Sequence, residues 1–193
     1  MATDTAALLE AARLGDQAAW DALVGDFNGL VWSIARSYRL EMADAHDAVQ
    51  MTWLRLVENL NRIKDPERLA GWLATTARRE CLQLIRKSGR ERPAANDAAL
   101  LDVPDTAAPV DAELLLDERD GALWRAFKLI GEKCQRLLRV LMASPPPSYQ
   151  AVAAALDIAV GTIGPARQRC LEQLRRRVLA DDSLAGQLKG DLA

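Results

Sequence analysis

Apolar residues recur at intervals of three and four along most of this 193-residue chain. This spacing predicts amphipathic helices. Leu8, Leu9 and Ala12 mark a short first helix that Gly15 ends, and Asp16 is placed to cap the next helix. The apolar positions of the following helices are Trp20, Leu23, Val24 and Phe27, then Leu30, Val31, Ile34 and Tyr38, and then Ala45, Ala48, Val49, Trp53, Leu56 and Leu60.

A long helix is predicted to follow Pro66, a residue that suits the first turn of a helix. Its expected buried positions are Leu69, Trp72, Leu73, Thr76, Ala77, Leu84 and Ile85. Residues 93–113 then lose the periodicity and contain three prolines among small and acidic residues, which is typical of a flexible linker. Helical spacing returns near Leu114. Without a credible strand pattern, the sequence predicts an all-α chain of two small helical domains joined by a flexible acidic linker.

The stretch from Ser148 to Arg177 is typical of a helix-turn-helix. Ser148 can cap a small apolar helix, "DIAVG" forms the turn, and a second helix begins between residues 160 and 162. Pro165 loses little in the first turns of a helix, so we expect the helix to start late or to bend slightly there. Such motifs present the start of the second helix to the major groove. The candidate contacts are Thr162, Arg167, Gln168 and Arg169, and the simpler alternative is a helical hairpin with a solvated basic end.

Charge is segregated along the chain although the net charge is only −2. Residues 78–92 hold six basic and two acidic residues, residues 97–120 hold one basic and eight acidic residues, and residues 163–179 hold five basic and one acidic residue. Two basic segments on either side of an acidic one favour two surfaces that bind a polyanion.

Other chemistry is sparse in the sequence. The three cysteines have no C-x-x-C spacing, and we expect reduced, buried thiols in a cytoplasmic protein. His46 has no partners for a metal site, and the chain shows neither a phosphate-binding loop nor a nucleophile–base pair. No apolar run reaches the roughly 20 residues that span a membrane, and the first residues do not resemble an export signal. We therefore expect no enzyme activity, no cofactor, no metal and no membrane insertion.

Three blocks in the same order resemble bacterial sigma factors of the extracytoplasmic-function (ECF) type: "DAHDAVQMTWLRLVENL", "GWLATTARRECLQLIRKSGRER" and "SYQAVAAALDIAVGTIGPARQRCLEQLRRR". The resemblance implies a promoter-specificity subunit of RNA polymerase in the sigma-70 family, with only regions 2 and 4. It implies region 2 over residues 1–92, a linker over 93–113, region 4 over 114–180 and a short tail over 181–193.

The resemblance also implies roles for individual residues. The candidates for binding the β′ clamp helices of core RNA polymerase are Asp47, Gln50, Trp53 and Leu54. The candidates for binding the −10 promoter element are Asn61, Arg62, Ile63, Lys64, Arg78, Arg79, Arg86 and Lys87. The helix-turn-helix would read the −35 element, and the first helices of its domain would dock on the β flap. An anti-sigma factor is the further partner that the family implies.

Two departures from the family pattern limit these expectations. Met51 stands where a glutamate is common, and Gly164 with Pro165 replaces basic or hydroxyl residues in the recognition helix, so the −35 sequence stays open. Trp72 lies in a block where some sigma factors use aromatic residues to open DNA, but its helical phase favours the core. The alternative functions are a stand-alone helix-turn-helix regulator that binds duplex DNA without polymerase, and an RNA-binding or anti-sigma-like interaction protein.

Overall fold

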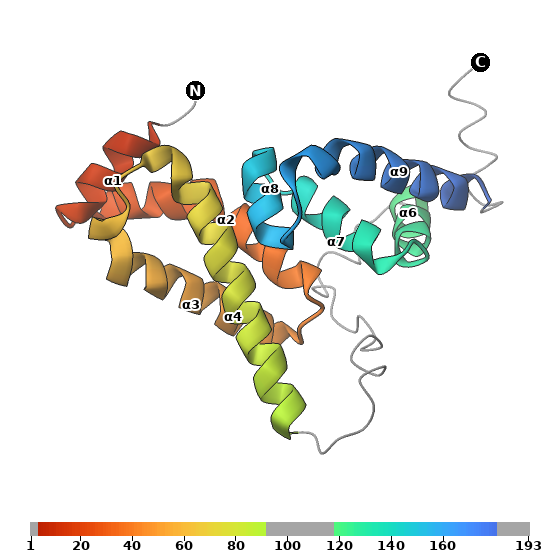
Figure 1. Cartoon of the computed structure of the whole chain (residues 1–193), viewed down its shortest axis with the longest axis horizontal. Helices are drawn as coiled ribbons and strands as arrows, with labels where there is room; N and C mark the ends of the chain where they lie inside the picture. The colour runs from red at the N-terminus through yellow and green to blue at the C-terminus, as the bar shows by residue number, and fades with distance from the viewer. Residues whose placement is uncertain (1–3, 92–117, 181–193) are drawn as a thin grey trace.

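The computed structural model describes residues 4–91 and 118–180, and all the regular secondary structure in these ranges is helical (Figure 1). The first range contains α1 (Thr5–Arg13), α2 (Gln17–Ser37), α3 (Met42–Asn59), two short 3₁₀ turns (Leu60–Arg62 and Pro66–Arg68) and α4 (Leu69–Glu91). The second contains α6 (Glu118–Lys128), α7 (Glu132–Leu141), α8 (Tyr149–Leu156) and α9 (Val160–Leu179). The all-α prediction is confirmed, while the predicted linker over 93–113 and the tail over 181–193 lie outside the described residues.

Local capping explains where several helices begin. Asp16 Oδ1 accepts hydrogen bonds from the backbone N–H groups of Ala18 (2.8 Å) and Ala19 (3.3 Å), so it caps α2 as predicted. Gly15 precedes it with φ of +88°, a conformation that glycine adopts at little cost. Ser148 Oγ accepts from Ala151 N at 3.2 Å and caps α8, also as predicted. The two apolar stretches on either side of Gly29 form one continuous helix, α2.

Helices α1 to α4, the N-terminal helical group, enclose an apolar core. Leu23 and Ile34 of α2, Leu56 of α3 and Leu73 of α4 are fully buried in it. Each lies at a position that the periodicity of the sequence had marked as apolar. Burying side chains of this size stabilises a fold by about 1.5–3 kcal/mol each, so this group has a substantial core of its own.

Helices α6 to α9, the C-terminal helical group, pack around Val140, Val152 and Ile163, all fully buried. A disulfide joins Cys134 on α7 to Cys170 on α9, while Cys81 on α4 is a free, buried thiol. The expectation of three reduced cysteines is therefore wrong for Cys134 and Cys170. Their separation of 36 residues hides the pairing in the sequence, and only the fold of α9 across α7 brings the two side chains together.

The two groups pack against each other, with α8 on α4 and α7 on α2 (Figure 1). Tyr38 Oη donates a hydrogen bond to the carbonyl of Ala155 at 3.2 Å, and the Arg136 guanidinium lies 4.4 Å from the Tyr38 ring centre. Arg39 forms an ion pair with Glu132 at 2.7 Å across the same boundary. The sequence left the relative placement of the two groups open, and the structure brings them together as one body.

Candidate nucleic-acid and polymerase interface

One face of α3 presents four exposed residues at positions 47, 50, 54 and 57. Asp47 and Gln50 supply polar groups, and Leu54 and Val57 supply apolar side chains that are 47% and 57% exposed. Intervals of three, four and three residues place these side chains along one line on a helix. We call this line the α3 face. Exposed apolar side chains in a row, flanked by polar ones, are typical of a surface that docks a partner.

Two residues of α3 revise the predicted contact set. Trp53 is half-buried, and its indole N–H donates to Asn28 Oδ1 on α2 at 3.3 Å, so its ring is turned toward the neighbouring helix. Val57 was missed by sequence reasoning, although continuing the helical spacing from Leu54 by one step would have found it. The α3 face therefore contains Asp47, Gln50 and Leu54 from the predicted set, together with Val57.

The connection between α3 and α4 presents three polar side chains, from Asn61, Arg62 and Lys64, all of them exposed. Arg13 of α1 holds the backbone of this loop, because its guanidinium donates to the carbonyls of Leu60 (3.4 Å) and Ile63. Anchored carbonyls give the loop a fixed shape, and the sequence did not indicate this role for Arg13.

Ile63 does not lie open to a nucleic acid. Its side chain is 7% exposed and belongs to the core of the N-terminal helical group. The structure places Ile63 in the core because its apolar side chain packs inward while its polar neighbours face the solvent. Its role at the −10 element stays a prediction.

The basic residues of α4 differ in their surroundings. Arg79, Arg86 and Lys87 are exposed. Arg78 instead reaches the helix-turn-helix, where its Nη2 lies 2.6 Å from Oδ2 of Asp157, and its side chain is only 25% exposed. Asp157 ends α8 in the left-handed conformation with φ of +58°, which turns its side chain toward α4.

Glu80 does not share the exposed basic surface of α4, because its side chain is buried and paired internally. Arg55 of α3 donates from Nε to Glu80 at 3.4 Å and from Nη1 to Glu58 at 2.9 Å. Hydrogen bonds with Glu58 and Glu80 raise the pKa of Arg55 above its usual value. The negative charge of Glu80 is thus matched by a cation beside it, which leaves the outer face of α4 basic.

A groove of about 450 Å³ separates part of α4 from α8. Trp72, Thr75 and Arg79 line it from α4, and Ser148 and Gln150 line it from the start of the helix-turn-helix. Trp72 is half-buried, with part of its ring against the core as its helical phase predicted and part of it facing this groove.

The recognition helix α9 exposes Thr162, Arg167, Gln168 and Arg169. Thr162 Oγ1 donates to the carbonyl of Ala159 at 2.7 Å, so its hydroxyl supports the start of the helix. The helix begins at Val160, within the predicted range, and runs without interruption with Pro165 in its second turn. Of the two alternatives for Pro165, a late start or a slight bend, the late start is not seen. Residues 167–169 are consecutive, and a helix turns about 100° per residue, so they cover more than one face of α9.

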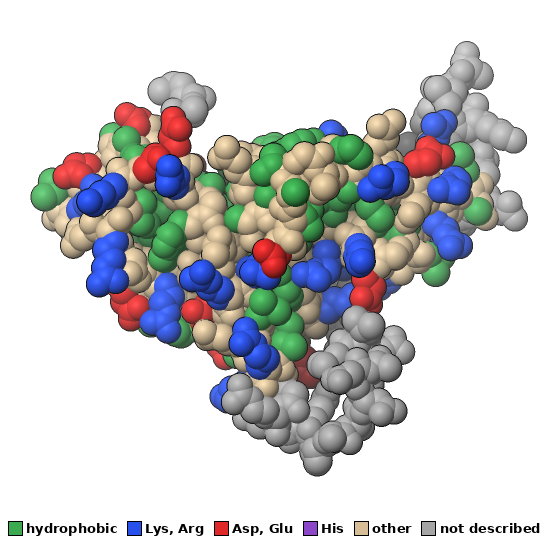
Figure 2. Space-filling model, viewed as in Figure 1, with side chains coloured by type: hydrophobic (Ala, Val, Ile, Leu, Met, Phe, Trp, Pro, Cys, Tyr) green, Lys and Arg blue, Asp and Glu red, His purple; other side chains and the backbone are tan. Residues whose placement is uncertain are grey.

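Basic side chains extend along the whole length of the molecule. Figure 2 shows Lys and Arg side chains over both α4 and α9, with hydrophobic side chains gathered near α8 between them. A path for a polyanion along the molecule would therefore cross the boundary between the two helical groups.

Within residues 4–91 and 118–180, no helix is both long and apolar enough to cross a membrane. In the same ranges no group of three His, Cys, Asp or Glu residues is arranged to hold a metal ion.

Comparison with known proteins identifies three kinds of relative. The sequence model described as Sigma-70 region 2 matches residues 23–91, which run from within α2 to the end of α4. The ECF RNA polymerase sigma factor SigE of Mycolicibacterium smegmatis is 29% identical over 165 residues. That match covers 83% of this chain and 63% of SigE, so this chain spans somewhat under two thirds of the relative's length.

Two solved structures share the fold. The complex of CnrH with the cytosolic domain of CnrY matches with a TM-score of 0.57 and 20% identity, covering 91% of this chain and 97% of the other. The complex of the sigma factor RpoE with the anti-sigma factor NepR from Bartonella quintana matches with a TM-score of 0.53 and 20% identity, covering 83% and 98%. Both likenesses extend over the two helical groups.

Proposed function

We propose, from the premise that this chain belongs to the ECF sigma factors of the sigma-70 family, that it is a promoter-specificity subunit of bacterial RNA polymerase. It would direct initiation by recognising −10 and −35 promoter elements and by helping to melt the DNA. This is a non-catalytic role in which binding and positioning perform all of the work.

The observation that supports this proposal best is the separation of three exposed surfaces on one chain. The α3 face offers apolar and polar groups to a protein partner, the loop at 61–64 with the end of α4 offers polar and basic groups to a nucleic acid, and α9 offers a second basic surface. A stand-alone regulator with a helix-turn-helix needs only the last of these. A subunit that must hold polymerase and touch DNA at two places needs all three.

The loop at 61–64 suits the capture of an unstacked base from a single strand. Asn61 supplies an amide that can hydrogen-bond to a base edge, and Arg62 and Lys64 supply charge for the backbone. Unstacking a base costs a few kcal/mol, so the site that receives it has to be fixed before binding. The hydrogen bonds from Arg13 to the loop carbonyls provide this rigidity, and the buried side chain of Ile63 packs the loop against the core.

Binding of the −10 element requires the two helical groups to move apart. Helix α8 packs on α4, and Arg78, one of the proposed −10 contacts, is paired with Asp157 of the helix-turn-helix. We infer that the packed form is a resting state and that docking on core polymerase separates the groups and frees Arg78. An anti-sigma factor, as in the RpoE–NepR complex, would act by preventing this separation.

The test is reconstitution with core RNA polymerase followed by mapping of transcription start sites. Replacing both Arg78 and Arg79 with alanine should weaken open-complex formation and leave binding to core polymerase unchanged. The slope of the logarithm of the promoter-binding constant against the logarithm of the salt concentration should become shallower by about two. Equal loss of polymerase binding would show that this surface was assigned wrongly.

A second pair of variants tests the α3 face. Leu54→Ala with Val57→Ala should weaken core binding, because both side chains are apolar and exposed on one line. Leu14→Ala is the matched control, since Leu14 is 84% exposed but lies outside this face. Duplex DNA binding that is tight without polymerase would instead favour the stand-alone regulator.

A further inference from the structure

The recognition helix α9 is held to its domain by few buried side chains. Of its 20 residues, only Ile163 and Cys170 are buried. Ile163 fixes the first turn, and Cys170 lies at the midpoint. Beyond Cys170 the described part of α9 has no buried residue, and Leu174 is the partly buried side chain that packs against the core there.

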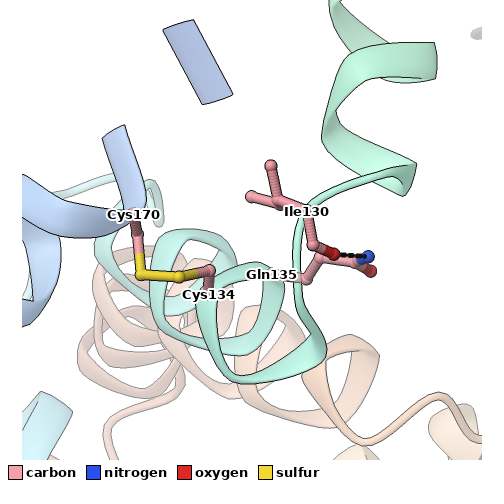
Figure 3. Close-up of a disulfide and its surroundings, with 4 residues drawn as sticks. All are labelled: Ile130, Cys134, Gln135 and Cys170. Carbon is pink, nitrogen blue, oxygen red and sulfur yellow. Dashed lines mark hydrogen bonds between the residues drawn. A yellow bond between two sulfur atoms is a disulfide. The ribbon is translucent and has the colours of Figure 1, made fainter. Parts of the chain in front are cut away.

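The disulfide is the covalent restraint on α9, which also packs against α6, α7 and α8. Figure 3 shows Cys170 reaching from α9 to Cys134, which lies in the first turn of α7. The α7 end of the bond is itself fixed, because buried Gln135 donates from Nε2 to the carbonyls of Ile130 (2.8 Å) and Lys128 (3.1 Å). The cross-link thus joins a rigid turn to a helix that is otherwise lightly attached.

The surroundings of the two cysteines favour chemistry at the sulfur atoms. Cys134 is the third residue of α7, and a helix N-terminus stabilises a thiolate. Cys81 is the contrast within the same chain, because burial raises the pKa of its thiol to about 12 and leaves it almost fully protonated at neutral pH. A thiolate is the reactive form, so the Cys81 thiol is poorly suited to react with an oxidant.

We propose that Cys134 and Cys170 form a reversible thiol–disulfide site that controls the order of α9 and, through it, recognition of the −35 element. Control of the order of α9 concerns the fold alone, whereas control of −35 recognition rests on the proposed function. Proteins that work with polymerase occupy a compartment where thiols are kept reduced, and disulfides found there are usually transient and redox-sensing.

The oxidant is a peroxide. The Cys134 thiolate attacks one peroxide oxygen, the O–O bond breaks, and the products are a sulfenic acid and, after protonation, an alcohol or water. The Cys170 thiol then attacks the Cys134 sulfur, the S–O bond breaks, and water leaves with the thiol proton. The two cysteines lose two electrons and the peroxide gains two.

The reductant is a dithiol, which runs the exchange in the other direction. One of its thiolates attacks a sulfur of the Cys134–Cys170 bond and forms a mixed disulfide. Its second thiol then displaces the remaining protein thiol and closes a disulfide within the reductant. Both protein sulfurs end as thiols.

The consequence for α9 follows from the position of the bond. Arg167, Gln168 and Arg169, the proposed −35 contacts, directly precede Cys170 in the sequence. With the bond formed, these side chains are presented by a helix fixed on both sides of them, by Ile163 and by Cys170. With the bond reduced, Ile163 and the Cys170 thiol are the buried side chains of α9, no covalent link holds the helix to α7, and its second half opens locally more often.

The test compares the full-length wild-type chain after treatment with hydrogen peroxide and after treatment with dithiothreitol. Alkylation and mass spectrometry should find Cys134 and Cys170 joined in the first sample and both free in the second. Amide hydrogen exchange across residues 171–179 should be roughly tenfold faster or more in the reduced chain. No change in exchange, or failure of either reagent to convert the pair, would overturn the proposal.

Variants separate this site from the third cysteine. Cys170→Ser should show fast exchange at 171–179 whatever the redox state, and Cys81→Ala should keep the full redox response. If Cys170→Ser does not fold, the comparison of oxidised and reduced wild-type chain still decides whether the disulfide orders α9, because it needs no substitution. If Cys81→Ala lost the redox change in hydrogen exchange at 171–179, the assignment of the redox site to Cys134 and Cys170 would be contradicted.

A transcription measurement tests the link to function. Holoenzyme reconstituted with the oxidised chain should initiate about tenfold better than with the reduced chain on a promoter with an intact −35 element, but equally on one with that element replaced. If initiation occurs without any redox effect, the redox site is refuted while the proposed function stands. If no initiation occurs, the hydrogen-exchange result still decides whether the bond orders α9.

Discussion

Gly29 offers a direct way to separate the two helical groups. It lies in α2 where this helix meets the segment between α7 and α8. A Cβ added at Gly29 would stand 2.1 Å from the backbone oxygen of Ser144 and 3.2 Å from its carbonyl carbon. Both neighbours are backbone atoms, so no side-chain rotation can relieve the overlap. We predict that Gly29→Ala opens the packed form.

The size of the effect comes from the overlap between the added Cβ and the Ser144 backbone. Ordinary carbon–oxygen contacts lie near 3.4 Å or beyond, so the Ser144 segment would have to withdraw by about 1 Å or more. Three prolines follow Ser144 directly and restrict how this segment can bend, so the shift is passed on to α8. Overpacking of this kind typically costs about 1–3 kcal/mol.

Alanine also favours the helix at this position by about 0.5–1 kcal/mol relative to glycine. That gain strengthens α2 in both the packed and the open form, so it does not oppose opening. A shift of one or two kcal/mol changes the ratio of packed to open forms by a factor of about 5–30.

Gly25→Ala is the matched control for this prediction. Gly25 lies one turn earlier in the same helix, and a Cβ added there meets nothing within 4 Å. It therefore gains the same helix propensity without any clash. The measurement is small-angle X-ray scattering of both variants and the wild type, combined with hydrogen exchange of α8 and with the affinity for a labelled single strand that carries a −10 element.

Gly29→Ala should show a larger radius of gyration, faster exchange in α8 and tighter strand binding than Gly25→Ala. The tighter binding follows because Arg78 and the α4 side of the groove lose the cover of α8. If the two variants gave the same radius and the same exchange, the packed boundary would not depend on this close approach. The reasoning from the Gly29 contact would then be wrong.

Four further predictions concern stability. Asp16→Ala removes the side chain that accepts two backbone hydrogen bonds at the start of α2, and should lower the free energy of unfolding in urea by about 1 kcal/mol. Ile63→Ala should cost about 2–5 kcal/mol in the same assay, as for a core residue, whereas a purely DNA-binding side chain would leave stability unchanged. Burial raises the pKa of the Cys81 thiol from 9.0 to about 12. Below pH 9 the thiol is protonated in both the folded and the unfolded chain, so it adds no pH dependence. Between pH 9 and 12 the unfolded chain loses this proton first, so stability should fall by about 1.4 kcal/mol per pH unit, and Cys81→Ala should flatten that part of the profile. Reducing the bond between Cys134 and Cys170, which closes a 36-residue loop, should lower the free energy of unfolding by about 4 kcal/mol in the chain-entropy model, measured as a fall in the melting temperature.

The features that the sequence predicted well are those set by short-range rules. Asp16 and Ser148 were expected as caps, and both accept backbone hydrogen bonds at the starts of their helices. The core positions of α2, α3 and α4 follow the 3.6-residue period, because burial on one side of a helix imposes that period. For the same reason the polar residues expected at the surface of α9 are exposed.

The features that the sequence did not predict depend on where distant segments meet. Cys134 and Cys170 are 36 residues apart, and nothing in their spacing indicates a bond. Ile63 lies between polar residues in the loop, and its position in the sequence does not show that its side chain turns inward while theirs face the solvent. The contact between Arg78 and Asp157 spans 79 residues and arises from packing of the two helical groups, which no local pattern records.

The packed form uses the same residues that the proposed function needs, and the energies involved explain how it can still open. The carboxylate of Asp157 stands where a DNA phosphate could approach Arg78, but Asp157 is 72% exposed. Ion pairs at such exposure contribute only about 0–1 kcal/mol and are screened by salt. Other polar links also cross the boundary. Tyr38 donates to the Ala155 carbonyl, and Arg39 pairs with Glu132 and donates to Gln135. A hydrogen bond of this kind typically contributes about 0.5–1.5 kcal/mol. In the proposed function, promoter DNA would offer Arg78 several phosphates in place of one carboxylate, and polymerase would cover the α3 face. Each of these exchanges would be small, so opening requires a partner that binds the open form more tightly than the packed form.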